Sequence, residues 1–327
     1  MSRTLTYREA LNEALREELD RDQRVLLIGE DIGQFDGAFR VTKGLLADYG
    51  EQRVRDTPSA QESIVGVGVG AALVGLRPVV ELMTITAALR ALDQIAISAS
   101  QARFQSGGQL TVPLVLRAPQ GGGHQLGPTH SHSFESLLLS IPGLLVAAPS
   151  TPADAKGLLK SAVRSDDPVF VIEHESLYGA KGEVPEGDHL VPFGEAVIRR
   201  PGRDLTILGI SRGATTALDG ADVLEREHGV SAEVIDPRTL RPLDLPTIIA
   251  SVQRTNRLLI VEEGWPQGGV GATIAALVQE QAFDYLDGPV LRVAGAEAPI
   301  GYSRVLERAA QAGAREVAQA ALAALGR

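Results

Sequence analysis

The sequence predicts an α/β protein of two domains, each built on a sheet of mainly parallel strands. The chain has 327 residues, and at roughly 100–200 residues per domain this length accommodates two. Short apolar segments alternate with amphipathic segments of helical spacing, as in sheets whose strands are joined by crossover helices. Between residues 178 and 201 glycine, proline and charge dominate, which indicates a linker between two such units.

The first half opens with a helical pattern over residues 4–22, in which leucine and alanine recur between charges. Residues 24–30 follow as a short apolar run that ends near a glycine, as a buried parallel strand would. Further strands are expected at residues 78–82, 112–117, 144–148 and 168–173. Helices are expected between them at residues 62–76, at 88–104 and from about residue 152.

The second half repeats this alternation after the glycine- and proline-rich segment. Its strands are expected near residues 205–210, 231–235 and 257–261. Its helices are expected near residues 213–227, 271–281 and 303–325. Strands that alternate with helices again predict a parallel sheet covered on both faces.

Composition excludes several classes of function. The 41 acidic side chains outnumber the 31 basic ones, for a formal net charge of −10, which argues against nucleic acid or an anionic membrane as the main partner. The absence of cysteine removes disulfides, thiolate nucleophiles and iron–sulfur clusters. No apolar run approaches the ~18 residues of a transmembrane helix, and residues 1–22 do not read as a signal peptide. We therefore expect a cytoplasmic protein.

A run of glycines at residues 66–71 fits the permissive dinucleotide-binding pattern G-x-G-x-x-A. That motif should directly follow a buried strand, but residues 56–63 are polar and broken by Pro58. We favour instead a helix whose small residues pack closely against a sheet or a neighbouring subunit. An NAD-dependent oxidoreductase is a distant alternative that rests on this motif.

Three histidines, His124, His130 and His132, lie in a segment rich in glycine. On an extended chain His130 and His132 would point to the same side, which metal ligation allows. Glycines at residues 121–127 indicate an irregular loop, and Glu135 is the only carboxylate close in sequence. We therefore favour a histidine-bearing active-site loop over a metal site. Solvated loop histidines are a competing interpretation.

A second glycine-rich turn, at residues 264–271, contains the only tryptophan and opens a helix. Such a turn at a helix N-terminus can hold an anion, although turn formation and packing are the commoner explanation. Spacing alone goes no further than a two-domain α/β protein with features of an enzyme.

A set of short segments, in order over nearly the whole chain, carries a specific resemblance. They are residues 29–33, 53–58, 64–73, 92–95, 130–133, 142–144, 154–159, 234–242 and 261–265. Together they resemble the beta subunit of the thiamine-diphosphate-dependent 2-oxoacid dehydrogenases of the pyruvate, branched-chain or acetoin type. The resemblance implies oxidative decarboxylation of a 2-oxoacid, most readily of the pyruvate type, with acyl transfer to a lipoyl group.

For the architecture, the resemblance implies a transketolase-like pyrimidine-binding domain at residues 1–185, a linker at 186–200 and a transketolase C-terminal-like α/β domain at 201–327. It implies a heterotetramer of two alpha and two beta chains, with thiamine diphosphate at the alpha–beta interface. In this family the alpha chain holds the diphosphate and magnesium through a Gly-Asp-Gly motif, which this chain lacks. A lipoyl acyltransferase core is the further partner implied, contacted through the C-terminal domain.

Site residues carried over position by position are only partly those of the family. Gln61 stands where the family has the glutamate beside N1′ of the aminopyrimidine, and an amide cannot exchange a proton near neutral pH. Glu62 is adjacent, but one residue along a helix turns about 100°, so it should point elsewhere. Ala87 replaces the usual stacking ring, and Ile85 in the same loop is not aromatic either. His130 is retained, and the family uses its equivalent in proton handling or reaction with the lipoyl group.

A potassium site of this family, formed mostly by backbone carbonyls, maps to Leu114, Ala162, Val163, Ser165 and Asp167. Ser165 stands where an aspartate is usual, and backbone ligands tolerate such a change. The departures at Gln61 and Ala87 also leave a second hypothesis open: a divergent, catalytically silent subunit retained for assembly.

Overall fold

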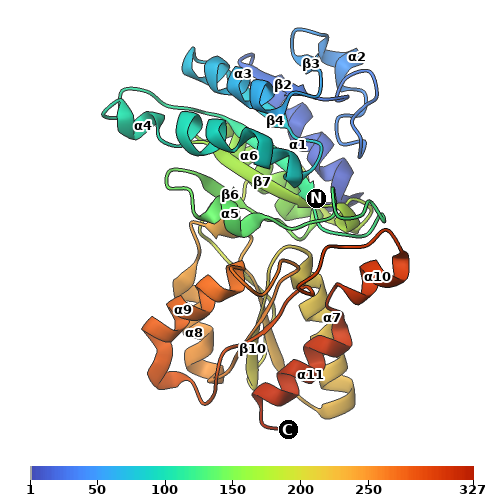
Figure 1. Cartoon of the computed structure of the whole chain (residues 1–327), viewed down its shortest axis with the longest axis vertical. Helices are drawn as coiled ribbons and strands as arrows, with labels where there is room; N and C mark the ends of the chain where they lie inside the picture. The colour runs from blue at the N-terminus through green and yellow to red at the C-terminus, as the bar shows by residue number, and fades with distance from the viewer. Residues whose placement is uncertain (1) are drawn as a thin grey trace. The chain divides into compact units, whose positions relative to one another are not determined.

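The chain folds into two compact units (Figure 1). The structure is a computed structural model and describes residues 2–327. Unit 1 comprises the chain before Gly121 together with Leu137–Phe193, and unit 2 comprises Gly121–Ser136 together with Gly194–Arg327. The histidine-bearing segment therefore groups with the second half of the chain. The domain boundaries expected at residues 185 and 201 stay a prediction.

Unit 1 is built around a parallel sheet whose strands lie in the order β6-β7-β5-β4-β2-β3. They are β2 (Val25–Gly29), β3 (Val54–Asp56), β4 (Arg77–Glu81), β5 (Val115–Gln120), β6 (Leu145–Ala147) and β7 (Val169–His174). In the register, Leu27 lies opposite Val54 on one side and Val79 on the other. All residues of β2, β5 and β7 are buried. The predicted parallel α/β sheet is confirmed, since strands buried on both faces give largely apolar runs.

Both faces of this sheet carry helices. The helices of unit 1 and of its boundary are α1 (Tyr7–Arg21), α2 (Leu45–Tyr49), α3 (Gln61–Leu73), α4 (Ala102–Gln105), α5 (Glu135–Leu139) and α6 (Pro152–Arg164). Val79 belongs to the core on the α1 side, whereas a Cβ on Gly68 of α3 would lie 2.7 Å from a methyl of Val80. Adjacent strand residues face opposite sides, so α1 and α3 cover opposite faces. The small-residue helix predicted over the glycine run is confirmed.

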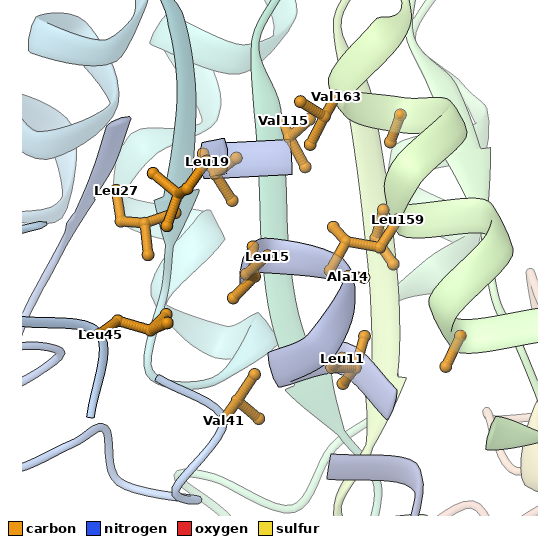
Figure 2. Packing of buried hydrophobic residues seen from close by; sticks show 14 of the residues in the cluster. Leu11, Ala14, Leu15, Leu19, Leu27, Val41, Leu45, Val115, Leu159 and Val163 are labelled. Atoms are coloured by element: carbon orange, nitrogen blue, oxygen red, sulfur yellow. The ribbon is translucent and has the colours of Figure 1, made fainter. Parts of the chain in front are cut away.

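The core on the α1 side is formed by leucines spaced along that helix (Figure 2). Leu11, Leu15 and Leu19 are at most 1 % exposed and pack with Val115 of the sheet and Leu159 of α6. Complete burial of one such side chain contributes about 1.5–3 kcal/mol. A capping box starts α1, because Thr6 Oγ1 accepts from Glu9 N and Glu9 Oε2 accepts from Thr6 N.

The helix expected over residues 88–104 is instead broken into short pieces. The 3₁₀-helix η1 (Ile85–Ala91) is followed by the π-helix η2 (Gln94–Ala99) and by α4. Ser100 explains the wide turn, since both its backbone N–H and its hydroxyl donate to the carbonyl of Ile95, at 3.2 and 2.7 Å. Periodicity of apolar residues alone does not reveal such a competing side-chain bond.

Unit 1 also contains an antiparallel pair of strands, separate from its main sheet, one in the segment predicted to begin a helix and the other in the predicted linker. Strand β1 (Ser2–Thr6) pairs with β8 (Lys181–Pro185), and Leu5 lies opposite Gly182. The short 3₁₀-helix η3 (Glu175–Leu177) leads from β7 towards β8. The N-terminal end of the described chain is thus tied to the end of unit 1.

Unit 2 has its own sheet, in the order β14-β13-β10-β11-β9. The strands are β9 (Val197–Arg200), β10 (Leu205–Gly209), β11 (Ala232–Asp236), β13 (Leu258–Val261) and β14 (Leu291–Val293), with β12 (Thr239–Arg241) outside this order. The helices are α7 (Arg212–His228), α8 (Leu245–Thr255), α9 (Val270–Ala282), η4 (Phe283–Tyr285), α10 (Arg304–Ala309) and α11 (Ala314–Ala324). Only β9 runs antiparallel to its neighbour among these pairs. The second expected α/β unit is therefore present.

The single helix expected at residues 303–325 is two helices, α10 and α11. Gly313 is the N-cap of α11, and its N–H donates to the carboxylate of Glu316 at 3.1 Å. Glycine is a poor residue for a helix interior, so this cap ends the pattern that continuous alanine suggested. Over residues 2–327, no helix is both long and apolar enough to cross a membrane.

Candidate active-site elements

The candidate site of unit 1 lies where β2 and β4 end and α3 begins. Gln61 is the first residue of α3 and is 7 % exposed. Its side-chain amide donates to Glu30 Oε2 and to Ser59 Oγ, each at 3.3 Å. Glu30 directly follows β2, and the carboxyl ends of parallel strands are where ligands bind in α/β folds. Glu62, in contrast, is exposed to solvent.

The loop after β2 is held in place by one carboxylate. Asp56, the last residue of β3, accepts from Gly33 N at 2.6 Å and from Gln34 N at 2.9 Å. A Cβ on Gly33 would lie 2.9 Å from that carboxylate, so a side chain there would push the loop away. Thr57 N also donates to Gly29 O at 2.9 Å. These bonds fix the backbone on either side of Glu30.

Ile85 and Ala87 lie on η1, which packs against α3. Ile85 is 1 % exposed and Ala87 is half-buried. The structure thus brings these two residues into the neighbourhood of the helix that begins at Gln61. Ala87 offers a small apolar surface, whereas Ile85 is almost fully buried, and neither side chain can stack as a ring would.

A buried ion network lies beneath this end of the sheet. Arg117 of β5 forms two bonds of 2.6 Å to the carboxylate of Glu173 on β7 and also pairs with Glu81 at the end of β4. Tyr178 donates to Glu173 at 2.6 Å. Burial acts to lower the pKa of Arg117, but the charge and hydrogen bonds of Glu173 together with the nearby Tyr178 and Tyr7 outweigh it, and the pKa is raised. Burial raises the pKa of Tyr178 well above its usual value. The network ties three adjacent strand ends together.

The candidate site of unit 2 is the segment Gly121–Ser136. His130 and His124 are exposed, whereas His132 is half-buried. The ring of His132 lies 4.8 Å from that of Trp265, and Phe134 lies 5.6 Å from the same indole. Burial lowers the pKa of His132. His132 therefore has a packing role, which also explains the only tryptophan.

No metal centre is built from these histidines. Within the part of the chain that the structure describes, no group of three or more His, Asp or Glu side chains could hold a metal ion.

The glycine-rich turn before α9 already binds a carboxylate of the protein. Glu262 Oε2 accepts from Gly271 N at 2.9 Å, so the anion at this helix N-terminus belongs to the chain itself. Burial raises the pKa of Glu262.

Two acidic residues hold the loop before His130, and sequence reasoning assigned neither of them a role. Glu307 of α10 accepts from the backbone N–H groups of Gly123 and Gln125, each at 3.0 Å. Glu263 Oε1 accepts from Gly122 N at 2.8 Å. Glu30, the partner of Gln61, lies in the recognised segment at residues 29–33, but no role was predicted for it from the sequence. Its position directly after a buried strand was the available signal.

The carbonyls of the expected potassium ligands all accept hydrogen bonds within unit 1. Arg77 Nη1 donates to Val163 O at 3.0 Å and to Ser165 O at 2.9 Å. The other bonds are Val169 N to Leu114 O at 2.9 Å, Ser165 N to Ala162 O at 3.1 Å and Ser165 Oγ to Asp167 O at 3.0 Å. A carbonyl oxygen has two lone pairs, so each of these groups retains one acceptor position. Whether potassium binds here stays a prediction.

Comparison with known proteins places both units. Residues 3–181 match the pyrimidine binding domain of transketolase, and residues 194–317 match the transketolase C-terminal domain. A solved structure titled as a split-gene transketolase, inactive beta4 tetramer, superposes with a TM-score of 0.81 over 98 % of each chain. Its sequence identity is 24 %, so this likeness concerns the fold alone.

Relatives of much higher identity are beta subunits of pyruvate dehydrogenase. The mitochondrial E1 component subunit beta of Dictyostelium discoideum is 44 % identical over 98 % of this chain and 91 % of its own length. The corresponding subunit of Rhizobium meliloti is 46 % identical over 97 % of this chain and 69 % of its own length. That of Rickettsia felis is 45 % identical over 97 % of both chains. The chain therefore belongs to the family of pyruvate dehydrogenase E1 beta subunits, with the two transketolase-type domains that its ordered motifs predicted.

Proposed function

We propose that the chain is the beta subunit of a 2-oxoacid dehydrogenase E1 component of the pyruvate type. It acts with an alpha chain in a complex of two alpha and two beta chains, decarboxylates the 2-oxoacid and passes the acyl group to a lipoyl arm. The observation that carries this proposal is identity of 44–48 % to pyruvate dehydrogenase E1 beta subunits over 94–98 % of the chain. The recognised segments at the ends of β2 and β3 and at His130 also support it.

Thiamine diphosphate is the cofactor of this proposal, and the residues of unit 1 fit its aminopyrimidine ring in part. A primary amide carries two N–H donors and one acceptor oxygen, so Gln61 suits a hydrogen bond to a ring nitrogen. Ala87 supplies apolar contact, while Ile85, which is 1 % exposed, offers little surface to the ring. When bound, the cofactor supplies the carbanion and the electron sink. Gln61 orients the ring without exchanging a proton, and Glu30, 3.3 Å behind its amide, is the ionisable partner.

Three further roles complete the proposal, the first of them that of His130. We assign it to the substrate side, where its imidazole handles a proton or meets the lipoyl group. Magnesium and the diphosphate belong to the alpha chain in this proposal. The C-terminal domain is the proposed docking site for a lipoyl acyltransferase core.

The first test is assembly. The chain is co-expressed with its cognate alpha chain, and the pair should co-purify as a stable complex. Steady-state decarboxylation of pyruvate by that complex then tests the activity. Two chains that never associate would exclude the proposal.

A second candidate function is a catalytically silent subunit retained for assembly, which Gln61 and the non-aromatic residues 85 and 87 favour. The variant Gln61→Glu separates the two. If the native chain is active, Q61E changes turnover and cofactor affinity by restoring a proton-exchanging group. If it is silent, the native complex assembles without turnover. A variant with unaltered turnover and affinity would mean that Gln61 does not lie at the ring nitrogen.

A further inference from the structure

The loop that leads to His130 has few side chains of its own to hold it. Residues 121–123 and 127 are glycines, and several positions of the loop have left-handed backbone. Among them is Gln125, with φ of +55°, a conformation that costs a residue with a Cβ roughly 1–2 kcal/mol. A loop of this composition adopts one shape only if other parts of the fold specify it.

Glu307 specifies this shape through three hydrogen bonds. Its Oε1 accepts from Gly123 N and Gln125 N at 3.0 Å, and its Oε2 accepts from the side-chain amide of Gln125 at 2.7 Å. Glu307 as a whole is 2 % exposed. Burial acts to raise the pKa of Glu307, but these hydrogen bonds outweigh it, so the pKa is lowered and the group is charged near neutral pH. Gln125, the strained residue, is thus held twice by one carboxylate.

Tyr302, which lies five residues before Glu307 in the chain, contacts the other end of the loop at Gly127. A Cβ on Gly127 would lie 2.2 Å from the ring of Tyr302, so only glycine allows this approach. The carbonyl of Gly127 accepts from His130 N at 3.3 Å and from Ser131 N at 3.1 Å, which forms the turn that carries His130. Glu307 therefore fixes the loop at residues 123–125, and Tyr302 packs against it at Gly127, just before the turn that carries His130.

We propose that Glu307 is a positioning residue for His130, and that its carboxylate sets where the imidazole stands during acyl transfer. This inference rests on the proposed function of His130. Glu307 does not touch the reacting groups, and it acts by fixing the loop from Gly123 to Gln125. Glu263, the other carboxylate that binds this loop, already accepts from Gly122 N, Gln311 and Arg212, so it is not free to take the place of Glu307.

The test compares Glu307→Ala and Glu307→Gln in the complex with the alpha chain. E307A leaves the three donors without an acceptor and should lower the rate of acyl transfer to a lipoyl substrate by about tenfold to hundredfold. E307Q keeps an oxygen for the two backbone amides, and the amide of Gln125 can turn to accept from the new N–H. The conservative variant should therefore recover most of the rate. Glu280→Ala, on the exposed face of α9, is the matched control.

A double-mutant cycle with His130→Ala separates positioning from general damage. If Glu307 acts through His130, E307A has no further effect on acyl transfer in the H130A background. Equal losses in both backgrounds would overturn the positioning role alone. If H130A by itself leaves acyl transfer unchanged, the role proposed for His130 is wrong, and the positioning role falls with it.

Hydrogen exchange gives a readout that does not depend on activity. In E307A, peptides covering residues 121–130 should exchange faster than in the native chain, while peptides of β10 stay protected and E280A stays native-like. Unchanged exchange in the loop would show that Glu307 does not fix it and would overturn the inference. Together with the cycle, this result shows which of the two proposals has failed.

Discussion

The two candidate site regions are held by different means. In unit 1 the frame consists of strand ends tied by the buried Arg117 network, while the proposed cofactor contacts include Gln61 and Ala87, where the family resemblance leads us to expect a glutamate and an aromatic ring. In unit 2 His130 is the proposed functional group, and its loop is bound by carboxylates from elsewhere in the unit, above all Glu307. An intact frame and an intact chemical group are thus separate properties, and each can be altered without the other.

The frame of unit 1 should be the more costly to break. Arg117→Met removes the cation that pairs with the buried Glu173 and Glu81, and their carboxylates lose that compensation. We expect a loss of about 3–5 kcal/mol in the free energy of unfolding, measured by urea denaturation. Arg203→Met, at a side chain that is 85 % exposed, is the control and should change stability by less than about 0.5 kcal/mol. Equal effects of both variants would contradict a structural role for the network.

The loop of unit 2 should be easier to disturb, with a consequence for function rather than for the whole fold. Gly127→Ala places a Cβ against Tyr302 at a φ of +72° and should cost about 1–2 kcal/mol. Acyl transfer in the complex should fall while β2 and β5 of unit 1 stay protected in hydrogen exchange. Adding Tyr302→Ala removes the clash but not the strain, so the double variant should recover only part of the rate. Full recovery would mean that the backbone conformation is unimportant.

The same contrast decides what the sequence could predict. Central strands of both units, such as β2 and β10, were predicted because burial on both faces makes them largely apolar, whereas the short edge strands β3, β9 and β14 were missed. The breaks at Ser100 and Gly313 were missed because a single side-chain bond or cap overrides a periodic pattern. Gln61 was found through the family resemblance. Glu307 could not be found, since it lies 184 residues from the backbone amide of Gly123 that it binds, and no local pattern encodes such a pair.

A smaller effect is expected from pH, through the buried Glu262 of unit 2. Burial raises its pKa above the ordinary value of 4.5, so the folded chain holds this proton more tightly than the unfolded chain does. Its contribution to stability is therefore favourable below pH 4.5 and is lost as the pH rises through the folded pKa. Glu262→Gln should reduce the fall of stability between pH 4.5 and 7 and retain the acceptor for Gly271 N. An identical pH profile for both proteins would contradict this assignment.

The smallest effect is expected from potassium in unit 1, where the chain already supplies a cation. Arg77 donates to the carbonyls of Val163 and Ser165, so any potassium ion must share these oxygens with a guanidinium, and its affinity should be low. At a concentration equal to its Kd, a bound ion stabilises by about 0.4 kcal/mol, or roughly 1 °C in Tm for a domain of this size. We expect a shift of this order in KCl over NaCl at equal ionic strength, and a larger one in Ser165→Asp, whose carboxylate offsets the charge of Arg77. Equal Tm values in the two salts for both proteins would mean that Arg77 alone occupies this cluster of carbonyls.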